Sequence, residues 1–120
     1  PPVPPAARML NSKMTYENHP EFFAFHDSCT LATDDAPIRV YKNKNEVFLS
    51  IYFKVLKSTT SIGIIDPNIL PAQLIIATCS GQNGTAYPLV IHPGNKKIYC
   101  DTTIPAGIYG MSITYPVKLF

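Results

Sequence analysis

Three successive residues carry the side chains of a hydrolytic triad: His26, Asp27 and Ser28. Nucleophilic catalysis needs the serine oxygen, the imidazole and the carboxylate to converge on one point. Adjacent residues of an extended strand point to opposite faces, so these three cannot converge unaided. The chain also lacks the G-x-S-x-G turn that exposes a nucleophilic serine in hydrolases. We therefore interpret the stretch as a polar strand end, and we expect the protein not to be an enzyme.

Side chains that could bind a metal ion are scattered along the chain. His26 and Cys29 would need His19 or His92 to complete a site, and sequence spacing alone does not bring these residues together. Scattered histidines and cysteines are more often unliganded than metal-bound. We therefore expect no metal site and no cofactor.

Paired carboxylates are the other chemistry to consider, because a glycosidase needs two acids that face one cleft. The candidates are Asp34, Asp35, Asp66 and Asp101. Asp34 and Asp35 share one loop and point apart, and Asp66 precedes a proline, which a turn explains more simply. No Asp-x-Asp-x-Asp-Gly array for calcium is present. A small polysaccharide depolymerase is therefore the least supported function.

The cysteines number three, at Cys29, Cys79 and Cys100. An odd number does not describe a disulfide framework. None belongs to a C-x-x-C pair of the kind that zinc sites use. Free cysteine behaves as a small hydrophobe, so we expect buried thiols in a reducing compartment. A bridge between Cys79 and Cys100 on neighbouring strands is the alternative.

Aromatic and polar side chains remain as candidates for ligand binding. The chain has seven tyrosines and six phenylalanines but no tryptophan. A tyrosine on an outward strand face offers an apolar ring and a polar tip to a sugar or a protein partner. Packing alone also explains many outward tyrosines. From expected exposure, the candidate ligand-binding residues are Tyr41, Tyr52, Gln82, Asn83, His92 and Tyr99.

Composition limits the classes of protein to which the chain can belong. Its 120 residues suffice for one domain with a core. It is 46% hydrophobic and only 15% charged, which suggests that apolar surface is covered by another chain. The net charge of +2 comes from dispersed basic residues, so we expect no nucleic-acid partner. No apolar run is long enough to span a bilayer, so we expect no membrane insertion.

The first residues, PPVPPAARML, have four prolines in the first five positions. Such a stretch favours an extended polyproline II segment. We expect residues 1–15 to be a connector or neck and residues 16–120 to be the folded head domain. Because the chain opens on proline rather than methionine, and no signal peptide is visible, we expect a piece of a longer protein.

Hydrophobic alternation predicts strands through most of the chain. The stretch IRVYKNKNEVFLSIYFKVLK (38–57) predicts a hairpin that turns at residues 43–45. In its second arm, alternate residues from Val47 to Val55 form a core face, and Phe48, Tyr52 and Leu56 lie on the other face. We expect that second face to contact another chain.

Shorter strands complete the prediction, and no amphipathic helix is evident. We expect them near residues 22–25, 28–32, 73–79, 86–92, 96–101 and 108–117, with turns or loops at 80–85, 93–95 and 102–107. The stretch SIGIIDPNILPAQLIIATCSG (61–81) is apolar but is interrupted twice at proline, which indicates strand, shaped loop and strand. The fold class is therefore all-β, an antiparallel β-sandwich of jelly-roll type with eight or nine strands.

The order of these pieces resembles the C-terminal head domains of phage tail-fibre and receptor-binding proteins. In those domains an apolar strand enters a G-x-[IL]-P loop, and a hairpin and a closing Y-P strand follow. The resemblance covers roughly residues 38–117, and the insertion DPN at 66–68 departs from the pattern. The matching pieces are Gly63-Ile64-Ile65 through Leu70-Pro71, Leu89-Val90-Ile91 with Gly94 and Ile98, and Ile113-Thr114-Tyr115-Pro116.

The resemblance implies a homotrimeric head on a virion, which attaches to a host cell-surface saccharide or protein without catalysis. The loop breaks would let each strand meet a neighbouring subunit, and Phe48, Tyr52 and Leu56 would be intersubunit surface. No binding motif of the family can be carried over to particular residues here. Two alternatives remain: a capsid-decoration or baseplate domain, and a C1q/TNF-like or carbohydrate-binding module of a secreted protein.

Overall fold

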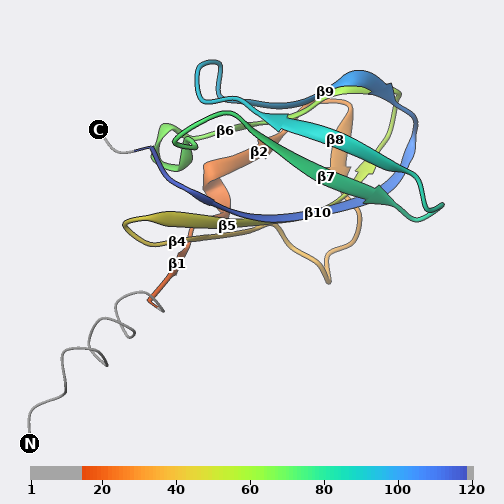
Figure 1. Ribbon diagram of the computed structural model, residues 1–120. Coiled ribbons are helices and arrows are strands. Elements are labelled where there is room, and N and C mark those ends of the chain that lie inside the picture. Colours follow the sequence, from red (N-terminus) through yellow and green to blue (C-terminus); the bar gives the residue numbers. More distant parts are fainter. Residues whose placement is uncertain (1–14, 119–120) are drawn as a thin grey trace, which may run out of the picture.

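The computed structural model describes residues 15–118, which form one curled antiparallel β-sheet with two short 3-10 turns (Figure 1). The expected connector at residues 1–15 lies almost entirely outside these residues. The strands are β1 (Glu17–Asn18), β2 (Phe23–Phe25), β3 (Cys29–Leu31), β4 (Arg39–Lys42), β5 (Glu46–Val55), β6 (Thr59–Ile65), β7 (Ile75–Gly81), β8 (Ala86–Ile91), β9 (Lys97–Ile104) and β10 (Gly107–Pro116). The helical turns are η1 (Pro20–Phe22) and η2 (Pro67–Ile69).

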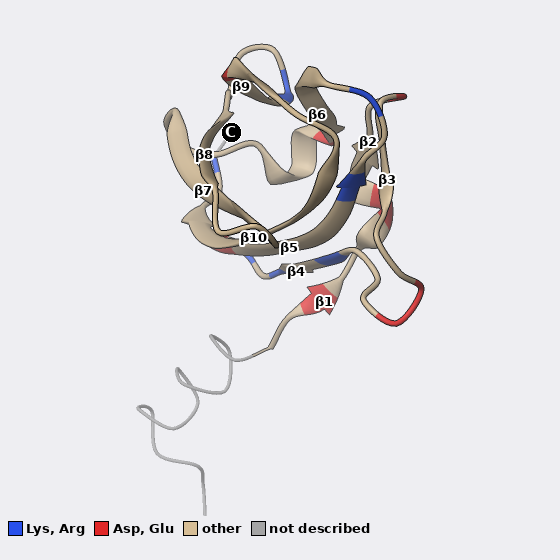
Figure 2. Ribbon diagram, turned by 90° about the vertical axis from the view of Figure 1, so that its right-hand side faces the viewer, with Lys and Arg blue, Asp and Glu red and all other residues tan. Residues whose placement is uncertain are grey.

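The strand order in the sheet is β1-β4-β5-β10-β7-β8-β9-β6-β2, and β3 also pairs with β5. The sheet curls so that its inner face surrounds the hydrophobic core (Figure 2). Opposite parts of the sheet therefore face each other across the core, as the two layers of a sandwich do. The all-β, antiparallel class predicted from the sequence is confirmed.

The β4–β5 hairpin forms as predicted. The Asn43 side chain closes its turn, because Oδ1 accepts hydrogen bonds from the backbone N–H of Asn45 at 2.8 Å and of Glu46 at 2.9 Å. Alternate residues from Val47 to Val55 are all buried, and β10 pairs with β5 along its full length. This hairpin and β10 form the wall that carries the candidate site.

The twice-interrupted stretch is strand, loop and strand, as predicted. β6 ends at Ile65, and the carboxylate of Asp66 then caps η2 by accepting from the N–H of Asn68 at 2.8 Å. The apolar residues of the loop turn inward, since Ile69 is fully buried and packs in the core. The hydroxyl of Tyr115 donates to the Ile69 carbonyl at 2.7 Å. The breaks thus place the loop in the core of its own chain.

The predicted loop over residues 102–107 is wrong. β9 continues to Ile104 and β10 begins at Gly107, so only residues 105–106 connect them. Thr102 and Thr103 are β-branched and favour extended backbone. Ile104 is fully buried and pairs with Thr59 of β6, so core packing extends the strand beyond the polar residues.

The three cysteines are free and buried, as expected. Burial raises the pKa of the Cys29 and Cys79 thiols to about 11, so both are protonated at neutral pH. Cys79 lies on β7 and Cys100 on β9, and β8 separates these strands. The neighbouring-strand arrangement assumed for a Cys79–Cys100 bridge is therefore wrong.

Candidate functional site

An aromatic hollow lies on the outer face of the sheet, where β4, β5 and β10 are side by side. Tyr41 and Phe48 are direct partners in the β4–β5 register, and their rings stack with centroids 6.1 Å apart. Thr114 is the partner of Phe48 on β10. Tyr16, which precedes β1, adds a third ring. We call these four residues the aromatic hollow, and they line an open hollow of about 540 Å³.

Hydrogen bonds fix the tyrosine hydroxyls of the aromatic hollow. The Tyr16 hydroxyl donates to the carboxylate of Glu46, and this bond raises the pKa of Tyr16. The Arg39 guanidinium donates to the Tyr41 hydroxyl at 3.0 Å. Strand pairing thus positions Tyr41 and Phe48, and polar contacts fix the hydroxyls of Tyr16 and Tyr41.

Two of the other candidate ligand-binding residues meet further along the same face. The side-chain amide of Gln82, in the β7–β8 turn, donates to the Tyr52 hydroxyl at 2.9 Å. Tyr52 lies opposite Gly110 of β10, where a Cβ would come within 3.5 Å of its ring. Tyr52 and Phe48 are four residues apart on β5, about 13 Å along a strand. Tyr52 and Gln82 therefore neighbour the hollow without lining it.

The remaining three candidates lie elsewhere and do not form one site with Tyr41. Asn83 closes the β7–β8 turn, where Oδ1 accepts from the N–H of Thr85 at 3.1 Å. His92 shapes the β8–β9 turn, where Nδ1 accepts from the N–H of Gly94 at 2.9 Å. Tyr99 is half-buried on β9. The structure gives Asn83 and His92 local roles in turns.

Tyr16 and Thr114 were not predicted from the sequence as site residues. Tyr16 fell in a stretch that gave no clear strand pattern, and Thr114 lies 66 positions from its partner Phe48. One signal was available for Thr114, since residues of β10 that alternate with the buried Tyr115 must face outward. No signal in the sequence indicated that β10 pairs with β5.

A charge-free face covers the outer side of β10, β7 and β8. Alternation places Ile76 on this side, where it is 64% exposed, whereas its β8 partner Val90 is already buried at 7% exposure. None of the outward residues is Asp, Glu, Lys or Arg, and Figure 2 shows β7 and β8 without charged residues. We define the charge-free face as Ile108, Gly110, Ser112, Pro116, Leu74, Ile76, Thr78, Ser80, Ala86 and Pro88.

The expected interface residues lie outside this face. Phe48 belongs to the aromatic hollow, and Tyr52 is tied to Gln82. Leu56 follows β5 and is 54% exposed. The charge-free face thus lies on β7, β8 and β10, and not on β5, where the sequence predicted the interface.

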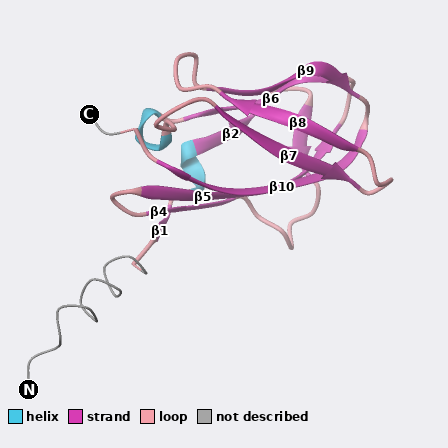
Figure 3. Ribbon diagram, in the orientation of Figure 1, coloured by secondary structure: helices cyan, strands magenta, loops and turns pink. Residues whose placement is uncertain are grey.

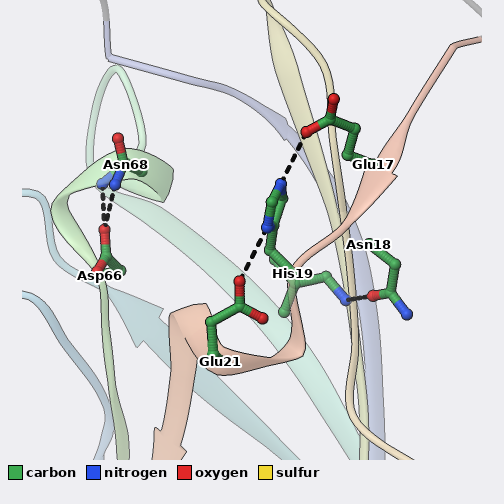
Figure 4. A network of polar contacts seen from close by, with 7 residues as sticks. Glu17, Asn18, His19, Glu21, Asp66 and Asn68 are labelled. Atoms are coloured by element: carbon green, nitrogen blue, oxygen red, sulfur yellow. Dashed lines mark hydrogen bonds and ion pairs between the residues drawn. The ribbon is translucent and has the colours of Figure 1, made fainter.

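A second hollow, of about 730 Å³, lies at the end of the sheet beside β1. We call it the polar hollow, and its lining includes Glu17, His19, Phe22, Lys42, Lys44 and Asn68. Figure 4 shows the His19 ring between two carboxylates. Nδ1 is 2.9 Å from the Glu21 carboxylate, and Nε2 is 3.0 Å from the Glu17 carboxylate. Both hydrogen bonds raise the pKa of His19, and the bond to Glu21 has the larger effect.

From the sequence, His19 is a candidate only for metal binding. Strand alternation gave no signal for this network, because β1 ends at Asn18 and Glu21 lies in the η1 turn. Within residues 15–118, no group of three or more histidine, cysteine or acidic side chains could hold a metal ion.

The triad suggested by sequence order lies in the turn between β2 and β3. The backbone N–H of Ser28 donates to His26 Nδ1 at 3.2 Å, so the imidazole contacts a main-chain group.

Within the described part of the chain, no helix has the length and apolar character needed to cross a membrane.

Comparison with known proteins adds no assignment. No protein-family model matches the chain. A search of the curated proteins also gives no match.

Proposed function

We propose that the protein is a non-enzymatic receptor-binding head of a phage fibre, which attaches the virion to a host cell-surface saccharide through the aromatic hollow. The observation that carries this proposal is the stacked pair of Tyr41 and Phe48 beside Tyr16 and Thr114 on an outer sheet face. The resemblance of roughly residues 38–117 to fibre heads is the reason for proposing a phage fibre and attachment to a host cell. The location of the protein on a virion is part of the proposal.

The chemistry of the aromatic hollow suits a sugar ring. One face of a pyranose is a row of C–H groups that packs on an aromatic ring, and its hydroxyls need donors and acceptors at the edge. Phe48 supplies an apolar surface, while Tyr16, Tyr41 and Thr114 supply hydroxyls at the rim. The hollow, of about 540 Å³, is open to solvent, so a saccharide would lie against the sheet and not inside a closed cavity.

Binding to a glycan array, followed by calorimetry with a bound oligosaccharide, tests the proposal. We expect Phe48→Ala to weaken binding at least ~10-fold, because an aromatic stacking contact contributes about 1.5 kcal/mol or more with its buried area. Tyr99→Ala is the matched control, since it removes a half-buried tyrosine from β9. Equal affinity of the Phe48→Ala protein and the wild type would refute the site. New reducing ends in the saccharide would refute a purely binding function.

We also propose that the head is a homotrimer and that the charge-free face is buried between subunits. Identical chains can bury an uncharged face without leaving an unpaired charge in the interface. Outward side chains elsewhere on the sheet include charges, such as Arg39 on β4 and Lys54 on β5. Interfaces between obligate subunits are depleted in charged residues in the same way.

Light scattering after gel filtration tests this arrangement. We expect a native mass three times that of the chain. Ile76→Lys should dissociate the trimer by placing an ammonium group in the apolar contact, whereas Leu56→Lys, a change at a similarly exposed leucine, should not. A monomeric wild type would refute the homotrimer. If only Leu56→Lys dissociates the trimer, the interface lies instead on the face of Phe48, Tyr52 and Leu56 that the sequence predicted.

A further inference from the structure

The aromatic hollow runs across three strands of the sheet. Tyr41 of β4 is the register partner of Phe48 of β5, and Phe48 is the partner of Thr114 of β10. The planes of the Tyr41 and Phe48 rings are 19° apart, and Tyr16, which precedes β1, lines the hollow on the β4 side. Neighbouring strands are about 4.8 Å apart, so the backbones at Tyr41 and Thr114 are about 10 Å apart across the sheet. A ligand of that length can contact the whole row.

A polyproline II segment has the spacing that this row requires. It has three residues per turn and rises about 3.1 Å per residue, so prolines three positions apart share a face and lie about 9 Å apart. Aromatic-lined grooves bind proline-rich segments of this kind, because the segment is already extended and loses little entropy on docking. Two prolines on one face would match the distance from Tyr41 to Thr114.

The hydroxyl groups of the hollow suit a ligand that only accepts hydrogen bonds. The Tyr41 hydroxyl accepts from the Arg39 guanidinium at 3.0 Å, so its own proton is available to another acceptor. Thr114 is exposed and supplies a second hydroxyl donor. Proline has no N–H, and the carbonyls of a polyproline II segment make no internal hydrogen bonds. Donors in the hollow and acceptors in such a segment are therefore complementary.

The sequence contains such a segment close to the hollow. The residues PPVPP carry the P-x-x-P spacing twice, from Pro1 to Pro4 and from Pro2 to Pro5. They lie outside the described residues, which start one position before Tyr16. We propose that residues 1–5 dock in the aromatic hollow of their own chain as a polyproline II segment, and that a saccharide must displace them. The displacement rests on the proposed function, whereas the docking does not.

The connection between the segment and the hollow is long enough for this contact. Residues 6–15 join Pro5 to Tyr16, and an extended chain of about ten residues spans about 33 Å. Tyr16 itself lines the hollow, so the connection only has to reverse direction and return. A short tether gives an effective concentration of about 1 mM, so a segment with an intrinsic Kd of about 0.1 mM would occupy about nine hollows in ten. Docking therefore needs only weak intrinsic affinity.

Nuclear magnetic resonance of the ligand-free full chain tests the docking. We expect nuclear Overhauser contacts between the proline ring protons of residues 1–5 and the ring protons of Tyr41 and Phe48. The Pro4→Gly, Pro5→Gly double variant breaks both P-x-x-P spacings, so it should lose these contacts and shift both ring resonances. The Ala6→Gly, Ala7→Gly double variant is the matched control, since it loosens the connection and keeps every proline, and it should retain the contacts.

Two results would overturn the docking. One is the absence of proline contacts to these rings in the wild type. The other is a contact that appears only between labelled and unlabelled chains in a mixed sample, which would assign the segment to the hollow of a second copy.

Calorimetry with the array-identified oligosaccharide then tests the displacement. The Pro4→Gly, Pro5→Gly variant should bind about tenfold more tightly than the wild type, because a hollow that is free one time in ten has its apparent affinity reduced by that factor. The Ala6→Gly, Ala7→Gly variant should stay within about threefold of the wild type, since the same arithmetic applies to it. Equal affinities of the wild type and the proline variant would overturn the displacement. Absence of saccharide binding in all three proteins refutes the proposed function without affecting the resonance result.

Discussion

Two neighbouring segments attach to the same end of the sheet by different physical means (Figure 3). The η2 loop is held by burial, since Ile69 is in the core and the Tyr115 hydroxyl contacts its carbonyl. The β1–η1 segment is held at the surface by hydrogen bonds to β4, among them that of the His19 N–H to the Val40 carbonyl at 2.8 Å. The segments touch, because the N–H of Asp66 donates to the Phe22 carbonyl at 2.8 Å. The η2 loop is thus attached mainly by burial of apolar side chains, and the β1–η1 segment mainly by hydrogen bonds at the surface.

The largest expected effect is on the buried attachment. Ile69→Ala should lower the free energy of unfolding by about 2–5 kcal/mol, because it removes buried methyl groups and leaves a cavity. Urea denaturation followed by circular dichroism measures the change. Ile64→Ala is the matched control, since Ile64 is 57% exposed, and it should cost less than about 1 kcal/mol. Equal losses in the two variants would contradict the view that Ile69 anchors the loop.

A smaller effect is expected from one hydrogen bond of each segment. Tyr115→Phe leaves the Ile69 carbonyl without its buried donor and should destabilise the protein by about 1–2 kcal/mol. Tyr16→Phe removes an exposed hydrogen bond to Glu46 and should leave the denaturation midpoint unchanged. Thermal unfolding of both variants at pH 7 provides the comparison. A larger loss in Tyr16→Phe would show that the β1 segment contributes more to global stability than its exposure indicates.

The smallest effect is the pH dependence contributed by His19. Its pKa is raised in the folded protein, so its stabilising contribution is present below about 6.5, the unfolded value, and is lost as pH rises through the folded pKa. We expect the wild type to lose slightly more stability than His19→Gln over that interval. Parallel urea titrations at half-unit pH steps would detect the difference. Identical pH profiles would contradict the link between His19 charge and folding.

The sequence predicted the parts of the fold that depend on local pattern. Alternation from Val47 to Val55 identified the β5 core face, and the prolines around η2 marked a shaped loop. The loop predicted over residues 102–107 was wrong, because burial of Ile104 outweighed the polar composition around it. Local pattern therefore identifies strands well where burial and polarity alternate regularly, and fails where a core contact extends a polar strand.

The candidate site was predictable only in part. The hairpin pattern predicted Tyr41 as a ligand-binding residue and Phe48 as an interface residue, although the two rings lie in one site. Their contact follows from the hairpin register, whereas Tyr16 and Thr114 join them through pairings distant in sequence. Strand order determines which outward side chains meet, and a single sequence carries little information about that order.

The most direct test of the central claim is to locate bound saccharide on the protein by ¹H–¹³C resonance mapping of the aromatic rings. The oligosaccharide selected by glycan array is titrated into the full chain. We predict that the rings of Tyr16, Tyr41 and Phe48 shift on binding and that the Tyr99 ring does not. Shifts confined to Tyr99 and His92 would contradict recognition through the aromatic hollow and would place the ligand on the opposite part of the sheet.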